Sequence, residues 1–440
     1  MTWMHEVQNV LYHLRKKFLC LSLFFLIISS LLSGCVSVEV TSTHTESDDN
    51  LVKVPTDVTD YGPITAATYG TVALTDHGLY LIEQHGSDFV SLMYGDLATQ
   101  HKVFLCANPS CEHNTEACTS YIPIQMGYAH PGIMSLNNEL YFVQADQVED
   151  TPPHIAVVSE DGLNHKQIVQ LPSSWRISSP YICKDSSYFY FFAEIVDSES
   201  GNSRTSLIQA SADGGGLTEI FNFNAEDSAQ YSLVGAVDRQ LVVVRYPIIG
   251  ETEEYKYYRI TPHGDISDEL SEAPLYVSNN HDVLAQLYPN GLLSTSVTKN
   301  GTANLCIKDL TKDEEVLIAV TAFDLGLSKI NSAFMRIPAP DCYILVAYDN
   351  QSMHEFLYDK TAEEFRPYTL EKHGDYATGT PDIIGEWEDY FILCTGDKNS
   401  KFDLYSADGT LDTSDTIQIT YALIPKNDFF SNNENYMIIE

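Results

Sequence analysis

The amino-acid sequence predicts an all-β chain, a β-propeller of seven to eight four-stranded blades that occupies residues 61–440. Three observations lead to this fold class. Short apolar stretches come in pairs that are joined by turn residues. These pairs recur about every 50 residues, within the range of propeller repeats. Beyond the N-terminal segment, no stretch of comparable length has the 3.6-residue apolar period of a helix.

The first hairpin of each repeat joins an apolar strand to a strand rich in aromatic and β-branched residues, which favour strands. The turns between them contain Asp-His-Gly, Asn-Asn, Asp-Ser-Ser or Pro-Asn-Gly, residues typical of tight turns. The segments that follow this pattern are 71–82, 132–143, 181–192, 233–244, 283–297, 334–347, 383–394 and 429–439.

A second hairpin is predicted between successive first hairpins, on the evidence of a recurring turn. The turn segments are Ser159–Gly162, Ser211–Gly214, Pro262–Asp265 and Ser406–Gly409, with looser versions at Thr311–Asp313 and Asp359–Thr361. Two hairpins give four strands in each repeat, which is one propeller blade.

The repeats add up to seven complete units and a C-terminal half repeat. Residues 429–440 are expected to form the inner hairpin of one more blade, with residues 51–68 supplying its missing outer strand. Such closure would remove unpaired strand edges. A seven-bladed ring with an appended hairpin is the alternative. An elongated β-solenoid is a further alternative, although solenoid repeats are usually far shorter.

The N-terminal segment has the pattern of a secretion signal. A basic cluster, Arg15–Lys17, precedes an apolar run of about fifteen residues, Phe18–Leu32, which is shorter than the ~20 residues that span a bilayer. The run ends in Leu-Ser-Gly-Cys35, which resembles the lipobox of bacterial lipoproteins. The resemblance implies cleavage after residue 34, lipidation of Cys35, and anchoring at the extracytoplasmic face of the cell membrane. The alternative is an uncleaved anchor helix.

Residues 35–60 are polar, acidic and rich in serine and threonine, so we expect a flexible tether. The formal net charge of −37 makes nucleic acid an unlikely partner, because such a chain repels phosphate backbones. A hydrophobic content of 44% is sufficient for a core. The expected partners are therefore the membrane, through the lipid anchor, and an unknown protein or glycan ligand.

Four candidate metal ligands, Cys106, Cys111, His113 and Cys118, lie within 13 residues. Three thiolates and one imidazole match a closed tetrahedral zinc site, which would be structural. A disulfide within the cluster is the alternative, but it would leave one thiol unpaired and His113 unexplained. An unbonded cluster also remains open. The other cysteines beyond the signal, in single apolar strands, are expected to be buried small hydrophobes.

The Ser-x-Asp-Gly turns after aliphatic strands resemble those of TolB-type propellers. The chain as a whole resembles uncharacterised propeller lipoproteins of Gram-positive anaerobes, which share the lipobox, the repeats of about 50 residues and the Cys-x4-Cys-x-His-x4-Cys element. This resemblance implies a propeller fold and a location at the extracytoplasmic face of the cell membrane, and no established activity.

The sequence contains no nucleophile elbow, no His-Glu-x-x-His motif, no phosphate-binding loop and no dinucleotide fingerprint. We therefore interpret the chain as a non-enzymatic binding or scaffold module. The alternative is a cell-envelope hydrolase or lyase that acts on polysaccharide or peptide, because propellers also host such chemistry.

Overall fold

The computed structural model describes a single compact part of the chain, which lies within residues 50–440. The described residues are 62–440, except 87, 109, 126–130, 163, 198–199, 224–229, 247–253, 264–265, 267–269, 271–273, 280–282, 289–290, 313, 340–341, 351, 360–361 and 406–410. Among them, no helix is both long enough and apolar enough to cross a membrane. The predicted signal, Cys35 and the tether lie outside the described residues.

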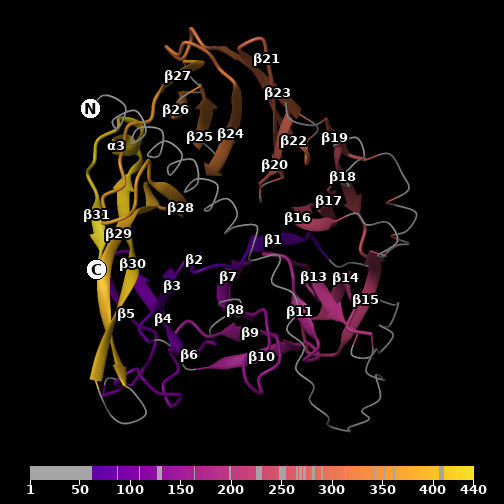
Figure 1. Cartoon of the computed structure of the whole chain (residues 1–440), viewed down its shortest axis with the longest axis vertical. Helices are drawn as coiled ribbons and strands as arrows, with labels where there is room; N and C mark the ends of the chain where they lie inside the picture. The colour runs from indigo at the N-terminus through magenta and orange to yellow at the C-terminus, as the bar shows by residue number, and fades with distance from the viewer. Residues whose placement is uncertain are drawn as a thin grey trace, which may run out of the picture. The chain divides into compact units, whose positions relative to one another are not determined.

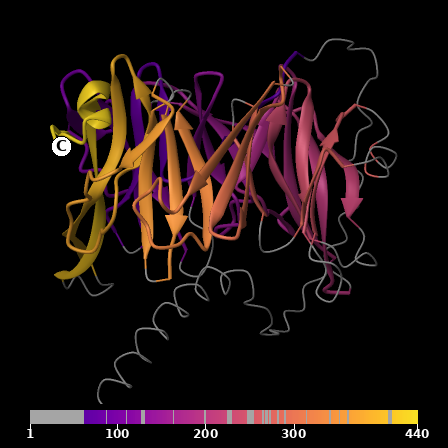
Figure 2. The ribbon, with the colours of Figure 1, turned by 90° about the horizontal axis from the view of Figure 1, so that it is seen from above.

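The described residues form a seven-bladed β-propeller, which confirms the predicted fold class (Figure 1). Each blade is an antiparallel sheet in which four strands follow one another from the inside of the ring to its outer edge. The ring runs from indigo at the first blade to yellow at the seventh, and these two blades are neighbours. Figure 2 shows the same ring edge-on.

Among the first three blades, blades 1 and 3 carry additional strands beside the basic four, and blade 2 has four. Blade 1 contains β2 (Val72–Thr75), β3 (Gly78–Gln84), β4 (Phe89–Asp96), β5 (His101–Phe104) and β6 (Tyr121–Pro123). Blade 2 contains β7 (Gly132–Leu136), β8 (Glu139–Gln144), β9 (His154–Val158) and β10 (His165–Gln170). Blade 3 contains β1 (Thr65–Thr68), β11 (Trp175–Ile177), β12 (Tyr181–Lys184), β13 (Tyr188–Val196), β14 (Ser203–Ser211) and β15 (Leu217–Phe223).

The last four blades have four strands each. Blade 4 contains β16 (Tyr231–Val237), β17 (Gln240–Arg245), β18 (Glu254–Ile260) and β19 (Tyr276–Asn279). Blade 5 contains β20 (Val283–Leu287), β21 (Leu292–Lys299), β22 (Thr302–Asp309) and β23 (Glu314–Thr321). Blade 6 contains β24 (Ser332–Ala339), β25 (Cys342–Tyr348), β26 (Met353–Asp359) and β27 (Glu364–Pro367). Blade 7 contains β28 (Asp382–Trp387), β29 (Tyr390–Tyr405), β30 (Leu411–Pro425) and β31 (Met437–Ile439), with the helix α3 (Lys426–Phe430) between its last two strands.

The core of the molecule lies between the blades. The buried apolar residues of the described chain form seven clusters, and each cluster joins two neighbouring blades. Tyr141 of blade 2, for example, meets Phe189 of blade 3 edge to face at 5.4 Å, and both rings are almost completely buried. The second strand of a blade is buried on both faces, which explains apolar runs such as Tyr188–Ala193. Seven junctions between seven blades close the ring.

The predicted Ser-x-Asp-Gly turns join the third strand of a blade to its fourth. Ser211 donates its hydroxyl to the Asp213 carboxylate, and the N–H of Gly214 donates to the Ser211 carbonyl at 3.2 Å. Gly214 has a φ of 86°, a left-handed conformation that glycine adopts without strain. The turn Ser159–Gly162 has the same hydroxyl–carboxylate bond, from Ser159 to Asp161 at 2.7 Å.

The turn predicted at residues 406–409 was assigned to the wrong place in its blade. It falls between β29 and β30, the second and third strands of blade 7, because these two strands form one long hairpin. The turn residues themselves lie outside the described residues.

The predicted inner hairpin at residues 429–440 is also wrong. Lys426–Phe430 forms α3, and β31 pairs with β30 as the fourth strand of blade 7. The backbone of Glu440 then accepts a hydrogen bond from Lys102 at 2.6 Å and donates one to Gln100 at 2.9 Å. The C-terminus therefore fastens the outer edge of blade 7 to blade 1, and no eighth blade begins there.

The N-terminal strand β1 lies at the inner side of blade 3, where it pairs with β12, and does not complete an outer strand as predicted. The preceding residue, Ile64, donates its N–H to the carbonyl of Asp238 in blade 4 at 2.5 Å. Gly70, two residues after β1, exchanges two backbone hydrogen bonds with Ile133 of blade 2, at 3.0 and 2.8 Å. The chain thus passes along blades 4, 3 and 2 before it enters blade 1, and β1 crosses the centre of the ring in Figure 1.

Consecutive strands of a blade alternate in direction, so the turns divide between the two faces of the ring. The turns from the first to the second strand share one face, because the N–H of Asp76 in blade 1 donates to the Asn138 side chain in blade 2 at 2.6 Å. Asp238 lies in the equivalent turn of blade 4, so Ile64 reaches this face, which we call the entry face. The turns from the second to the third strand lie on the opposite face.

Candidate metal centre

The cysteine–histidine segment is an insertion in the outer strand of blade 1. Both β5 and β6 pair with β4, one after the other. Leu105 donates its N–H to the carbonyl of Leu92 at 2.9 Å, and the N–H of Leu92 donates to Ser120 at 2.8 Å. The chain therefore leaves the sheet and returns to it beside one residue of β4. Residues 106–119 form a loop on the blade edge, as predicted.

The loop brings the four predicted ligands together. One ligand atom each from Cys106, Cys111, His113 and Cys118 lies within 4.8 Å of the others, and no other such group of three or more metal-binding side chains occurs among the described residues. The Nδ1 atom of His113 is 3.3 Å from the sulfur of Cys118. Cys118 is buried, with 3% of its surface exposed, and the other three residues are half-buried.

Local hydrogen bonds give the loop its shape. The N–H and hydroxyl of Ser110 both donate to the Asn108 side chain, at 3.1 and 2.9 Å, and the N–H of Cys111 donates to the Asn108 carbonyl at 3.1 Å. His113 has a φ of 58°, and its N–H donates to the sulfur of Cys111 at 3.4 Å. The imidazole stacks on the Phe104 ring with 4.2 Å between ring centres. Phe104 is the last residue of β5, so the sheet positions the imidazole through this ring contact.

The close approach of the four side chains shifts the pKa values of two thiols. Burial raises the pKa of Cys106, but the backbone N–H of Asn108 and the side chains of Cys118 and Thr119 lower it more, so this pKa lies below its ordinary value. The backbone N–H of His113 lowers the pKa of Cys111, yet desolvation and the neighbouring thiols outweigh it, so this pKa is raised. Without a cation, the crowded sulfurs thus disfavour several thiolates at once.

This donor set could hold a metal ion. Three sulfurs and one imidazole nitrogen, close enough to share one ion, are the ligands of a closed tetrahedral site. All seven described cysteines are free in this structure. A site with four protein ligands has no open position for a substrate, so a metal ion bound by all four would hold the loop together.

The remaining described cysteines lie in separate strands, and two of the four are buried as predicted. Cys183 in β12 and Cys342 in β25 are completely buried, whereas Cys306 in β22 and Cys394 in β29 are half-buried. Burial raises the pKa of Cys183 above its ordinary value, so this thiol stays protonated.

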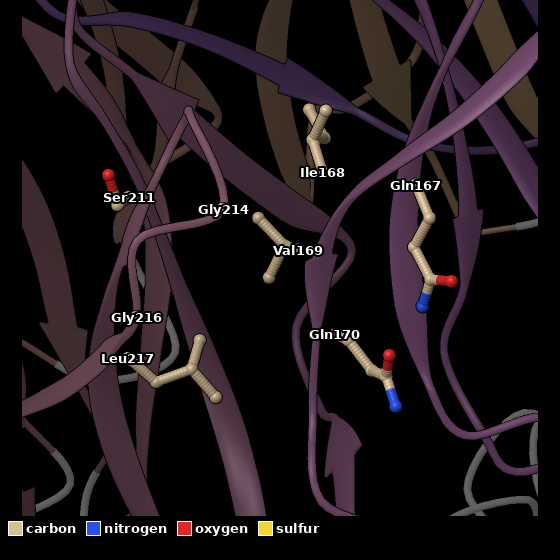
Figure 3. A pocket seen from close by; sticks show the side chains of 8 residues that line it. All are labelled: Gln167, Ile168, Val169, Gln170, Ser211, Gly214, Gly216 and Leu217. Atoms are coloured by element: carbon tan, nitrogen blue, oxygen red, sulfur yellow. The ribbon is translucent and has the colours of Figure 1, made fainter. Parts of the chain in front are cut away.

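A glycine-rich turn in blade 3 borders a shallow cavity of about 260 Å³ beside β10 of blade 2 (Figure 3). Gly214, Gly216 and Leu217 form one side, and Val169 and Gln170 form the other. The N–H of Gly215 already donates to the Asp213 carboxylate at 2.8 Å. The glycines therefore serve the hairpin turn, which was the interpretation from the sequence.

One polar network could not be found from the sequence. The buried carboxylate of Asp185 in blade 3 accepts the Tyr190 hydroxyl at 2.6 Å and the backbone N–H groups of Ser187 and Tyr188, both at 2.7 Å. The imidazole of His263, from blade 4, lies 3.1 Å from the Tyr190 hydroxyl. Burial raises the pKa of Asp185, but the hydrogen bonds from His263, Tyr190 and the backbone bring it below the ordinary value. The network therefore ties blade 3 to blade 4.

Comparisons with known proteins do not assign the chain to a family. No protein-family model matches the chain, and no curated protein matches it. Among solved structures, an oligogalacturonate lyase in complex with manganese is 8% identical, with a TM-score of 0.45, and the match covers 86% of this chain and 93% of that one.

Two further similarities are to a protease domain and to an oligopeptidase. The β-propeller domain of the trilobed protease from Pyrococcus furiosus is 11% identical, with a TM-score of 0.38, over 81% of this chain and 97% of that one. Prolyl oligopeptidase B from Galerina marginata is 11% identical, with a TM-score of 0.40, over 82% of this chain and 47% of that one. Similarity at this level concerns the fold, which hosts many activities.

Proposed function

We propose that the chain is a lipid-anchored binding module of the cell surface. Cys35 carries the lipid, residues 35–60 form the tether, and the propeller presents its free face to a ligand. The observation that carries the proposal is the path of β1. The chain reaches Ile64 on the entry face and is then hydrogen-bonded to blades 4, 3 and 2. A ring that is tethered on one face leaves the turns of the opposite face accessible.

The anchor is tested by metabolic labelling of the full chain with radioactive palmitate, followed by separation of membrane and soluble fractions. We expect label on the wild-type protein and a membrane location. Cys35→Ala should lose the label and should no longer be processed at residue 34, because the thiol accepts the lipid before cleavage. Cys306→Ser, a cysteine change within the propeller, is the matched control. Label that persists in Cys35→Ala would overturn the proposal.

We further propose that the ion held by Cys106, Cys111, His113 and Cys118 is zinc. The support is the soft, closed donor set, since thiolates and imidazole suit Zn²⁺ better than Mg²⁺ or Ca²⁺. The test is elemental analysis with thiol counting on the full chain, purified without oxidant or chelator. One zinc per chain that is lost in His113→Ala supports the site. Absence of metal together with two missing free thiols would instead establish a disulfide.

A further inference from the structure

A cavity on the face opposite to the entry face lies between blades 5 and 6, which are neighbours in Figure 1. Its volume is about 670 Å³, within the range of small-ligand sites. One wall is the turn from β21 to β22 around Asn300, and the other is the connection from β23 to β24 around Phe323. Both walls belong to the accessible face of the proposed binding module.

Phe323 is unusual because 91% of its surface is exposed. The turn that carries it is fixed on both sides. The N–H and hydroxyl of Thr321 donate to the Asp324 carboxylate at 2.7 and 2.8 Å, and the N–H of Gly326 donates to the carbonyl of Phe323 at 3.1 Å. Beneath the turn, Leu325 is packed into the core between blades 5 and 6. The backbone therefore presents the ring to solvent at the rim of the cavity, and an exposed aromatic ring at a cavity is a feature of ligand sites.

The other lining groups are almost all uncharged. They are hydroxyls, amides, backbone and the apolar side chains of Ala322 and Ile330, with Lys329 as the one charged side chain in the lining. The lining contains no carboxylate, although the whole chain has 61 Asp and Glu residues and a formal net charge of −37. A metal ion would need carboxylates here, and the positive charge of Lys329 disfavours an organic cation. Hydroxyls and amides instead both donate and accept hydrogen bonds, as a neutral polyhydroxylated ligand requires.

We propose that this cavity binds a short neutral oligosaccharide. The apolar face of one pyranose ring stacks on Phe323, and the sugar hydroxyls bond to Asn300 and to the threonine hydroxyls of the β21–β22 turn. An aromatic ring combined with a few placed polar groups is the usual composition of a small-ligand site, because the ring supplies contact area and the polar groups fix orientation. This inference rests on the proposed function, which it deepens by naming the ligand class and its place.

The test is binding of the full chain to an array of neutral oligosaccharides built from glucose, galactose, mannose or N-acetylglucosamine, with charged glycans on the same array. The variants are Phe323→Ala, Phe323→Trp and Asn300→Ala. The matched control is Tyr376→Ala, which removes another exposed aromatic side chain far from the cavity in the sequence. Thermal melting verifies that each variant is folded, and folding is expected because the changed side chains are exposed.

We expect the wild-type chain to bind at least one neutral oligosaccharide. Phe323→Ala should weaken this binding at least tenfold and Asn300→Ala several-fold, while Phe323→Trp and Tyr376→Ala should retain it. Binding to charged glycans alone, or to no glycan, would overturn the inference. Glycan binding that is unchanged in Phe323→Ala would also overturn it, and would leave the binding module itself standing. Failure of the lipid-labelling experiment would count against the proposed function without changing the array result.

Discussion

Loss of the metal from the blade 1 loop should destabilise the propeller by an amount that follows from the loop's length. The perturbation is His113→Ala, or treatment of the wild-type protein with a chelator. Cys106 and Cys118 stand at the two ends of the ligand set, and Leu105 and Ser120 join the loop to Leu92 in the sheet. An ion that stays bound to both cysteines in the unfolded chain cross-links about 13 residues in the manner of a disulfide, so the unfolded state loses conformational entropy. An ion that is released on unfolding stabilises the fold by its binding free energy, which is larger.

The chain-entropy relation gives about 3 kcal/mol for a closed loop of this length. An unfolding entropy of about 2.1 cal/mol/K per residue amounts to roughly 0.8 kcal/mol/K for a propeller of about 380 residues. The ratio of these two quantities gives a fall of about 4 °C in the melting temperature as the minimum effect. A larger fall is expected if the freed loop also detaches β6 from β4.

The assay is calorimetric or fluorescence-detected melting with and without chelator. Wild type and the matched control Cys306→Ser should both respond to the chelator, whereas His113→Ala should melt lower and should not respond. Cys306 lies outside the loop, in β22 of blade 5, which makes it a suitable control. Identical melting of wild type with and without chelator, together with wild-type melting of His113→Ala, would refute the reasoning.

Three further substitutions test the fold. Asp185→Asn should cost about 2–4 kcal/mol near pH 7, because it weakens a buried hydrogen-bonded network around a carboxylate. The pKa of Asp185 is lower in the folded state than in the unfolded state, so the ionised carboxylate stabilises the fold above about pH 4. This stabilisation is lost as the pH falls further. The free energies of unfolding of wild type and variant, measured by denaturant titration, should therefore converge toward low pH. Phe429→Ala removes a fully buried ring and should cost about 3–5 kcal/mol in the same titration; a change under 1 kcal/mol would contradict the burial of α3. Gly132→Ala places a methyl group 2.5 Å from the Tyr69 ring, so it should release the N-terminal segment, detected as faster proteolysis before residue 70; unchanged protection would contradict the bridge.

The blades could be predicted from the sequence, because each hairpin depends on residues that are close together in the chain. The hairpin at 132–143, for example, alternates apolar residues around Asn-Asn, and both Asn137 and Asn138 adopt the positive φ that such a turn requires. The four candidate metal ligands could also be identified from the sequence. They lie within 13 residues of one another, and the loop that carries them is attached to the edge of a single blade.

The two ends of the chain could not be predicted, because other parts of the ring decide their structure. Residues 429–439 have the apolar pattern of a hairpin around Ser-Asn-Asn. In the structure, Asp428 accepts hydrogen bonds from the side chains of Asn433 and Asn435, at 3.3 and 3.1 Å, and the chain turns outward to β31. The residues that were predicted to form two hairpins lie in β28 and in the long β29–β30 hairpin, which together make three strands. The fourth strand of blade 7 is β31, which pairs with β30.

The network of Asp185, Tyr190 and His263 was missed for a related reason. Asp185 lies in a turn of blade 3, and His263 follows a strand of blade 4. Each residue alone has the sequence context of an ordinary turn. Their proximity comes from the packing of one blade on the next, which periodicity within a blade does not specify.

The path of β1 determines how the propeller would carry a mechanical load. A force on residue 62, directed along β1, would act on the Thr65–Thr68 ladder with β12 and on the contacts with Asp238 and Ile133 together. Hydrogen bonds loaded in shear must break at the same time, whereas bonds loaded at one end break one by one. The load would enter blades 2 to 4 and bypass the junction of blades 1 and 7, where side-chain packing and the backbone of Glu440 close the ring. A pulling force on a ligand that is bound at the opposite face would therefore be borne by blades 2 to 4, and not by the junction of blades 1 and 7.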